Sequence, residues 1–178
     1  MMVLRRRMSG FLRDREGAAS LEFAILILPT LYILFSIAEA GLLMARTVMM
    51  DRGLDMAVRD IRLGLETGET HDGLKTRICE EAFLVGDCED SLVLELAPLE
   101  NTADFGAGEV NCVDRKADPP VAPVIEYDSG SRGEIMFVRA CLIVDPLFPG
   151  MGLGALLPVD ASGGHAIVVQ GAFMNEPT

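Results

Sequence analysis

The chain has few of the side chains on which binding and catalytic sites often depend: no tryptophan, two tyrosines and two histidines in 178 residues. Without such aromatic side chains, the sequence offers no evident stacking platform for nucleobases or sugars. The small number of histidines and the lack of a Cys-x-x-Cys spacing argue against a zinc site. No motif places His71 or His165 beside a nucleophile, so we predict no catalytic residue, no metal and no cofactor.

Basic residues are also scarce beyond the N-terminus. The formal net charge is −12, but residues 1–17 hold five arginines against Asp14 and Glu16, a net charge of +3. The remaining chain therefore carries −15. Because phosphate binding depends on lysine and arginine, we do not expect nucleic acid as a partner.

One long hydrophobic run follows the basic N-terminus. It extends from Phe23 to Leu43, and Glu39 is its one charged residue. This length is sufficient to cross a bilayer as a helix. A secretory signal has a shorter apolar region with the cleavage site after it. Since positive charge stays in the cytoplasm, we expect a single-pass inner-membrane protein with a cytoplasmic N-terminus and a periplasmic body.

The junction between the basic segment and the apolar run has a distinctive order of residues. Gly17 is followed by Ala18, and Glu22 stands five positions after the glycine, directly before Phe23. This order resembles the processing site of type IV pilins. The stretch GAASLEFAILILPTLYILFSIAEAGLL and the ending AFMNEPT resemble the TadE-like pseudopilins of the tight-adherence (Flp-type) pilus system. Phe23 departs from the tyrosine that is usual in the Flp branch.

The resemblance implies that a prepilin peptidase cuts after Gly17 and removes residues 1–17 as a leader. It also implies that Glu22 pairs with the free amine of Ala18 in a neighbouring subunit, an arrangement favoured where two charges lie in a low dielectric. The alternative is that Glu22 only complements the positive end of its own helix. Glu39 is the second candidate assembly residue, either paired within a helix bundle or placed at the outer headgroups.

Beyond the membrane the same helix is expected to continue. We predict one helix over residues 18–66, with the transmembrane part at about 23–43 and an amphipathic extension at 44–65. In that extension apolar residues recur at helical spacing, which predicts a face packed on an outer domain. They are Met50, Leu54, Ala57, Ile61 and Leu65. Gly64 and Gly68 are expected to end the helix.

Residues 67–178 predict a periplasmic α+β domain. A short helix, capped by Thr70 or His71, carries an apolar stripe of Leu74, Ile78 and Ala82, with Cys79 and Phe83 beside it. Strands are expected at 91–97, at 134–144 in the centre of the sheet and at 165–173, and 121–127 is a candidate edge strand. The fold class is therefore α+β, with a long helix, a second short helix and an antiparallel sheet of three to four strands.

All four cysteines lie on the side expected to be periplasmic, where disulfides persist. Four cysteines allow three pairings. We favour Cys79–Cys88, which closes a short loop, with Cys112–Cys141, which joins a long loop to the central strand. Free buried thiols are the alternative.

From these features we expect a non-enzymatic minor pseudopilin. It would assemble with other pilins and the pilus machinery of a tight-adherence pilus or related secretion apparatus, as a substrate of a prepilin peptidase. The first alternative is an uncleaved single-span envelope protein with a periplasmic binding module. The second is a membrane-tethered periplasmic enzyme.

Overall fold

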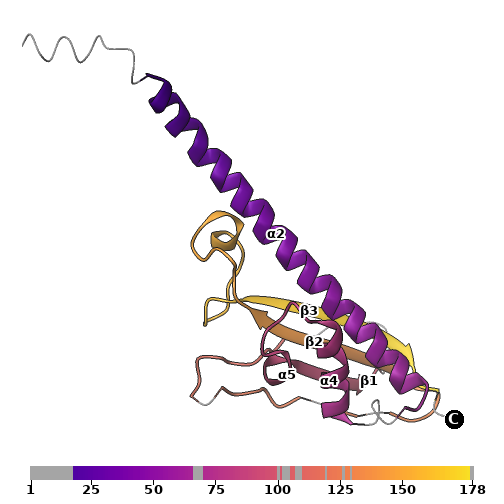
Figure 1. The fold of residues 1–178 in the computed structure, drawn as a ribbon. Helices are drawn as coiled ribbons and strands as arrows, with labels where there is room; N and C mark the ends of the chain where they lie inside the picture. Colours follow the sequence, from indigo (N-terminus) through magenta and orange to yellow (C-terminus); the bar gives the residue numbers. More distant parts are fainter. Residues whose placement is uncertain are drawn as a thin grey trace, which may run out of the picture.

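The computed structural model describes residues 18–65, 70–99, 101, 105–106, 110–118, 120–125, 127–128 and 130–176. It has the expected α+β architecture, with a long helix that extends far beyond a small domain (Figure 1). In chain order the elements are α2 (Ala18–Arg62), α4 (His71–Glu81), α5 (Cys88–Ser91), β1 (Val93–Pro98), β2 (Ile135–Val144), the 3-10 helix η2 (Gly152–Ala155) and β3 (His165–Met174). The expected leader, residues 1–17 with Gly17, lies outside the described residues.

Helix α2 is continuous over 45 residues, although Pro29 lies inside it. Proline removes one backbone donor from a helix. The hydroxyl of the next residue, Thr30, donates to the carbonyl of Leu26 at 2.7 Å, which adds a local hydrogen bond at this position. The N-terminal part of α2 projects away from the domain, and its C-terminal part lies across it (Figure 1).

The predicted amphipathic stripe of α2 is confirmed except at its end. Met50, Leu54, Ala57 and Ile61 are buried in the main core. The helix ends at Arg62, where Gly64 adopts a φ of 63°. Leu65 is consequently outside the helix and 45% exposed, so its predicted place on the stripe is wrong. Gly68 lies outside the described residues.

Helix α4 packs on the C-terminal half of α2. Thr70 is its N-cap, and the Thr70 hydroxyl accepts the N–H of Gly73 at 3.1 Å. Leu74 and Ile78 are buried, as the stripe predicted. Ion pairs join the two helices, with Arg77–Asp60 and Arg52–Glu81 both at 3.2 Å.

Contrary to the sequence prediction, Phe83 does not lie beside the buried apolar stripe of α4. The helix ends at Glu81, and Phe83 lies in the turn that follows, 72% exposed. Helical periodicity does not apply beyond the last helical turn, which explains why this part of the prediction is wrong.

The sheet is antiparallel in the order β1-β2-β3, so the predicted central position of β2 is confirmed. One face of the sheet packs against α2 and α4 and forms the main core. Its residues alternate along the strands, as expected for a half-buried sheet. They include Leu94, Leu96, Met136, Val138, Ala140, Leu142, Ile167 and Phe173.

The candidate strand at 121–127 is not found among the described residues of that range. Two isolated bridges occur instead, Asp114 with Val121 and Leu96 with Tyr127. Pro120 and Pro123 lack the N–H that a continuous ladder requires. The sheet therefore has three strands, at the lower end of the expected range.

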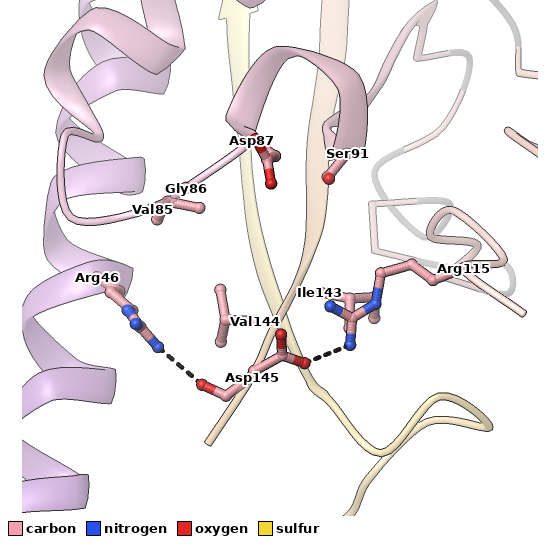
Figure 2. Close-up of a pocket in the computed structure, with 9 residues that line it drawn as sticks. All are labelled: Arg46, Val85, Gly86, Asp87, Ser91, Arg115, Ile143, Val144 and Asp145. Atoms are coloured by element: carbon pink, nitrogen blue, oxygen red, sulfur yellow. Dashed lines mark hydrogen bonds and ion pairs between the residues drawn. The ribbon is translucent and has the colours of Figure 1, made fainter. Parts of the chain in front are cut away.

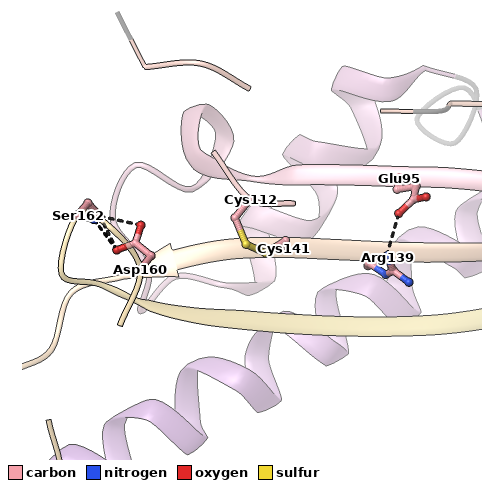
Figure 3. The surroundings of a disulfide bond; sticks show 6 residues. All are labelled: Glu95, Cys112, Arg139, Cys141, Asp160 and Ser162. Atoms are coloured by element: carbon pink, nitrogen blue, oxygen red, sulfur yellow. Dashed lines mark hydrogen bonds and ion pairs between the residues drawn. A yellow bond between two sulfur atoms is a disulfide. The ribbon is translucent and has the colours of Figure 1, made fainter. Parts of the chain in front are cut away.

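The second face of the sheet is covered by segments of the long loop between β1 and β2. Val113 packs with Val93 and Cys141 in a small cluster, and the rings of Phe105 and Phe137 lie 5.5 Å apart. Arg139, 5% exposed, pairs with Glu95 directly opposite it in the register, at 3.4 Å (Figure 3). The charge of Arg139 on an otherwise apolar strand is thus compensated across the sheet.

Candidate functional site

Of the residues predicted to form the processing site, Ala18, Glu22 and Phe23 lie at the start of α2, and Gly17 lies outside the described residues. Ala18 is the first residue of the helix. Glu22 and Phe23 follow on exposed surface, and Phe23 is 65% exposed. Within the part of the chain that the structure describes, Glu22 has no ion pair and no side-chain hydrogen bond.

This exposed part of α2 is strongly apolar. Among the described residues, α2 is the one helix long and apolar enough to cross a membrane, and the most apolar 18-residue window within it is not covered by the domain. Its large exposed side chains include Leu21, Ile25, Leu26, Leu28 and Ile33. Because so much apolar surface is costly in water, a single membrane crossing is consistent with this helix.

Glu39 is different from Glu22, because it is buried and held inside its own chain. Its side chain is 2% exposed. Oε1 accepts the backbone N–H of Leu147 at 3.0 Å, and Oε2 accepts the N–H of Phe148 at 2.9 Å. These partners are neither the neighbouring helix nor the headgroups expected from the sequence. Each carboxylate oxygen of Glu39 therefore has its own backbone donor from the loop.

The loop that binds Glu39, residues 145–164, runs from β2 along α2 and returns to β3 (Figure 1). Within it, Gly152 (φ 56°) approaches α2 so closely that a Cβ atom would lie 2.8 Å from the Ser36 hydroxyl and 3.2 Å from its backbone nitrogen. Tyr32 donates from its hydroxyl to the Gly152 carbonyl at 3.4 Å. The rings of Phe35 and Phe148 lie 4.6 Å apart. The loop is therefore packed on the helix from Tyr32 to Glu39.

Gly154 makes a second close approach in this loop. A Cβ atom at this position would lie 2.9 Å from the Phe148 carbonyl oxygen and 3.6 Å from Cδ of Glu39. Any larger residue would therefore disturb the segment that binds the carboxylate. The glycines at 152 and 154 allow the loop backbone to reach the helix.

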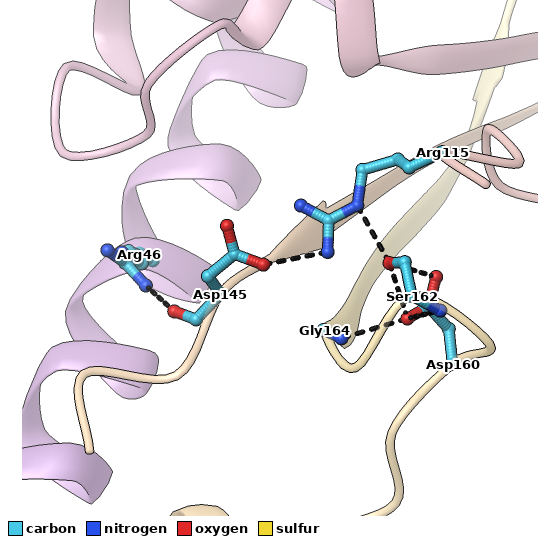
Figure 4. A network of polar contacts seen from close by, with 6 residues as sticks. All are labelled: Arg46, Arg115, Asp145, Asp160, Ser162 and Gly164. Atoms are coloured by element: carbon cyan, nitrogen blue, oxygen red, sulfur yellow. Dashed lines mark hydrogen bonds and ion pairs between the residues drawn. The ribbon is translucent and has the colours of Figure 1, made fainter. Parts of the chain in front are cut away.

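Two arginines tie the base of the loop to the domain (Figure 4). Arg46 of α2 donates to the carbonyl of Leu84 at 3.2 Å and to the carbonyl of Asp145 at 3.1 Å. The Asp145 carboxylate accepts from Arg115 at 2.8 Å, and Arg115 also donates to the Ser162 hydroxyl at 3.0 Å. Arg46 and Arg115 thus connect the helix, both ends of the loop and the segment near Cys112.

Asp160 organises the turn that leads the loop into β3 (Figure 4). Its Oδ1 accepts the N–H of Ser162 at 2.9 Å, the N–H of Gly164 at 2.8 Å and the Ser162 hydroxyl at 2.7 Å. Burial acts to raise the pKa of Asp160. The hydrogen bonds from Ser162 and Gly164, with the positive charge of Arg115, outweigh it and lower that pKa below its ordinary value.

A pocket of about 260 Å³ lies between α2, the turn at residues 85–87 with helix α5, and the end of β2 (Figure 2). Its charged side chains include Arg46, Arg115 and Asp145. Both arginines donate hydrogen bonds to Asp145, Arg46 to its carbonyl and Arg115 to its carboxylate. They act here as structural connections. Among the described residues no group of three or more histidine, cysteine, aspartate or glutamate side chains is placed to hold a metal ion.

The favoured disulfide pairing is confirmed. Cys79 of α4 is bonded to Cys88 of α5, and Cys112 is bonded to Cys141 of β2 (Figure 3). No free cysteine is present among the described residues, which include all four positions. The second disulfide fixes the loop segment that covers the outer face of the sheet.

A comparison with protein-family models found no match, and comparisons with curated proteins and with solved structures found no significant similarity.

Three features of this region were not predicted from the sequence: the contact of Glu39 with the loop, the role of Gly152 and the role of Gly154. The signal that was available is the glycine-rich, uncharged composition of residues 146–159. Repeated glycines in such a segment are consistent with a backbone that approaches another element closely. The sequence does not say that this element is α2, because Leu147 lies 108 positions from Glu39.

Proposed function

We propose that this chain is a minor pilin-like subunit, a pseudopilin, of a tight-adherence pilus or a related secretion apparatus. The observation that carries the proposal is the exposed start of α2, where Glu22 stands without a partner among the described residues on an apolar helix surface. An ionised carboxylate in or near a bilayer needs a partner. The free amine of Ala18 in a neighbouring processed subunit is a partner of the right charge.

The second half of α2 supports the same proposal. Met50 and Leu54 place the helix in the core of the domain, so the membrane segment and the folded body form one continuous element. A subunit built in this way can pack its exposed helix in a bundle while its domain remains outside the membrane. With the arginines of residues 1–17 at the cytoplasmic face, the domain is periplasmic.

Processing of the N-terminus tests this function. Co-expression with a prepilin peptidase should yield a membrane protein whose mass corresponds to a chain beginning at Ala18. Gly17→Leu should block this cleavage, whereas the control Gly10→Leu, in the same segment, should be cleaved normally. Recovery of the intact chain with Met1 in all three proteins would contradict the proposal and favour an uncleaved envelope protein.

A further inference from the structure

The loop at residues 145–164 is polar at its base, where it joins the domain, and apolar towards its tip. At its base, Arg46, Arg115 and Asp160 hold it to the domain through charged side chains. Nearer its tip, its one contact with a charged group among the described residues is that of the Leu147 and Phe148 N–H groups with Glu39. Residues 146–159 carry no charged side chain and no side chain that forms hydrogen bonds. We use "loop tip" for residues 147–157.

The loop tip exposes large apolar side chains. Leu156 is 73% exposed, and Leu147 and Met151 are about half exposed. These side chains gather on a segment that lies against Tyr32, Phe35 and Ser36, next to the part of α2 that is apolar enough to cross a membrane. The exposed apolar surface of the tip is therefore continuous with that of the helix.

The position of the loop tip along α2 indicates how deep the tip would lie in the membrane that α2 crosses in the proposed function. Beyond Glu39 the helix is packed on the domain, since Leu43 and Met50 contact the core. About 20 helical residues cross the hydrocarbon layer, and counting back from Ala38 ends near Ala19, where the candidate span begins. Tyr32 lies seven positions before Glu39, so the tip reaches about 10 Å beyond Glu39 at 1.5 Å per residue. This places the membrane boundary nearer to Glu39 than the expected limit at Leu43.

Several backbone N–H groups of the loop tip have hydrogen-bond partners within the protein, which lowers the cost of placing the tip in a membrane. The N–H groups of Leu147 and Phe148 bind Glu39, and those of Leu156 and Leu157 bind the carbonyl of Leu153 at 2.9 and 3.1 Å. Non-helical backbone is tolerated at membrane depth where it is buried in protein, and Gly152 and Gly154 of the tip are buried.

We propose that the loop tip enters the lipid leaflet on the domain's side of the membrane, beside α2, so that lipid covers Leu147, Met151 and Leu156. The expected depth of about 10 Å is within the range at which apolar faces of interfacial segments are buried. The inference rests on the membrane crossing that is part of the proposed function. It adds a second membrane contact, which fixes the height and rotation of the domain above the bilayer.

Single tryptophans test this inference, because the chain contains none. The full-length Leu156→Trp protein is compared with Phe83→Trp, which is at an equally exposed position (73% and 72%) in the turn after α4. Ile25→Trp, on the exposed apolar part of α2, reports on the span itself. Each protein is reconstituted in phosphatidylcholine vesicles with and without bromine on the acyl chains, and its quenching by aqueous acrylamide is also measured.

We expect brominated lipid to quench Leu156→Trp and Ile25→Trp strongly and to leave Phe83→Trp unchanged, whereas acrylamide should quench Phe83→Trp most. If Ile25→Trp is quenched and Leu156→Trp is not, the loop inference is overturned while the membrane crossing stands. Leu156→Trp that is protected from both quenchers would also overturn it, because a second copy or another protein would then cover the tip. If Ile25→Trp escapes quenching, the membrane crossing in the proposed function fails.

Discussion

Glu39 and Phe148, 109 positions apart in the chain, are joined by a hydrogen bond of 2.9 Å between the carboxylate and a backbone N–H. With the parallel bond to Leu147, it fixes the loop against α2. Glu39→Gln retains the size of the side chain but leaves one oxygen for two N–H groups. Since a hydrogen bond to a charged group contributes about 1.5–3 kcal/mol, amide hydrogen exchange at Leu147 and Phe148 should accelerate about tenfold to a hundredfold.

The matched control is Glu22→Gln on the same helix, which should leave exchange in the loop unchanged. Unaltered protection of Leu147 and Phe148 in Glu39→Gln would show that the carboxylate does not hold the loop.

Gly53 lies where α2 closely approaches α4. A Cβ atom at this position would lie 2.6 Å from the carbonyl oxygen of Ile78. Alanine favours a helix over glycine by about 1 kcal/mol, but overpacking of a tight contact costs about 1–3 kcal/mol. Gly53→Ala should therefore lower the midpoint of thermal unfolding, measured in detergent by circular dichroism.

Gly41, also within α2, is the control for this experiment because its Cβ would meet nothing within 4 Å. Gly41→Ala should leave the thermal midpoint unchanged or raise it. Equal effects of the two substitutions would contradict the close contact at Gly53.

The two disulfides should contribute unequally to stability. They join cysteines separated by 9 and 29 positions. The loop-entropy model gives about 2.6 kcal/mol for the shorter loop and about 3.6 kcal/mol for the longer. Replacement of Cys112 and Cys141 together by alanine should therefore reduce the free energy of unfolding more than replacement of Cys79 and Cys88.

Alkylation of the native protein without reductant should first find no free thiol. Four labelled cysteines in native membranes would contradict both the pairing and a periplasmic location for the domain.

Asp160 should make stability depend on pH in the acidic range. Its pKa is lowered in the folded protein by hydrogen bonds and Arg115, which together outweigh burial. A group of this kind stabilises the fold above its unfolded pKa, which is about 3.9 for aspartate, and the contribution is lost as the pH falls through the folded value. The difference in thermal midpoint between the native chain and Asp160→Asn should therefore be greatest above about pH 5 and shrink below about pH 4.

Asp90, which is exposed, provides the comparison. If the difference for Asp160→Asn stays constant down to the lowest pH, or is no larger than that for Asp90→Asn, the Asp160 carboxylate does not stabilise the turn.

Glu22 should act in assembly and not in processing. Glu22→Gln keeps the shape of the side chain and removes its charge. Leaving the neighbour's amine unpaired costs about 3–5 kcal/mol, which corresponds to a hundredfold or greater loss in association. Crosslinking to other pilins should fall sharply, while mass spectrometry should still show cleavage after Gly17.

A helix that only anchors one domain would respond weakly to the same change, since complementing a helix end contributes about 0.3–1 kcal/mol. Normal crosslinking by fully processed Glu22→Gln protein would remove the proposed contact between subunits.

Local periodicity accounts for the parts of the fold that the sequence predicted well. The apolar run and the spacing of Met50, Leu54 and Ala57 predicted one helix that enters a core. The alternation around Leu94 and the largely apolar run at 134–144 predicted two strands of the sheet. Such periodicity predicts which face of a segment is buried, and it does so without information on the element that the face packs against.

The missed features depend on partners far away in the chain or on where an element ends. Glu39 could be recognised as an unusual charge, but its contact with Leu147 spans 108 positions. Leu65 and Phe83 follow their helical patterns in sequence, yet both helices end before reaching them. At Val121 the extended pattern was correct, but the adjacent prolines leave too few donors for a strand.

Because α2 is continuous, its exposed start and the domain move together as one rigid element. Leu54 is fixed in the core, and Ala18 lies 36 helical positions away, about 54 Å at 1.5 Å per residue. A tilt of about 10° at the domain would displace the start of the helix by roughly 9 Å over that length. Because no loop interrupts the helix between them, a sideways force on the exposed N-terminal part of α2 reaches the domain as a rotation of the whole body.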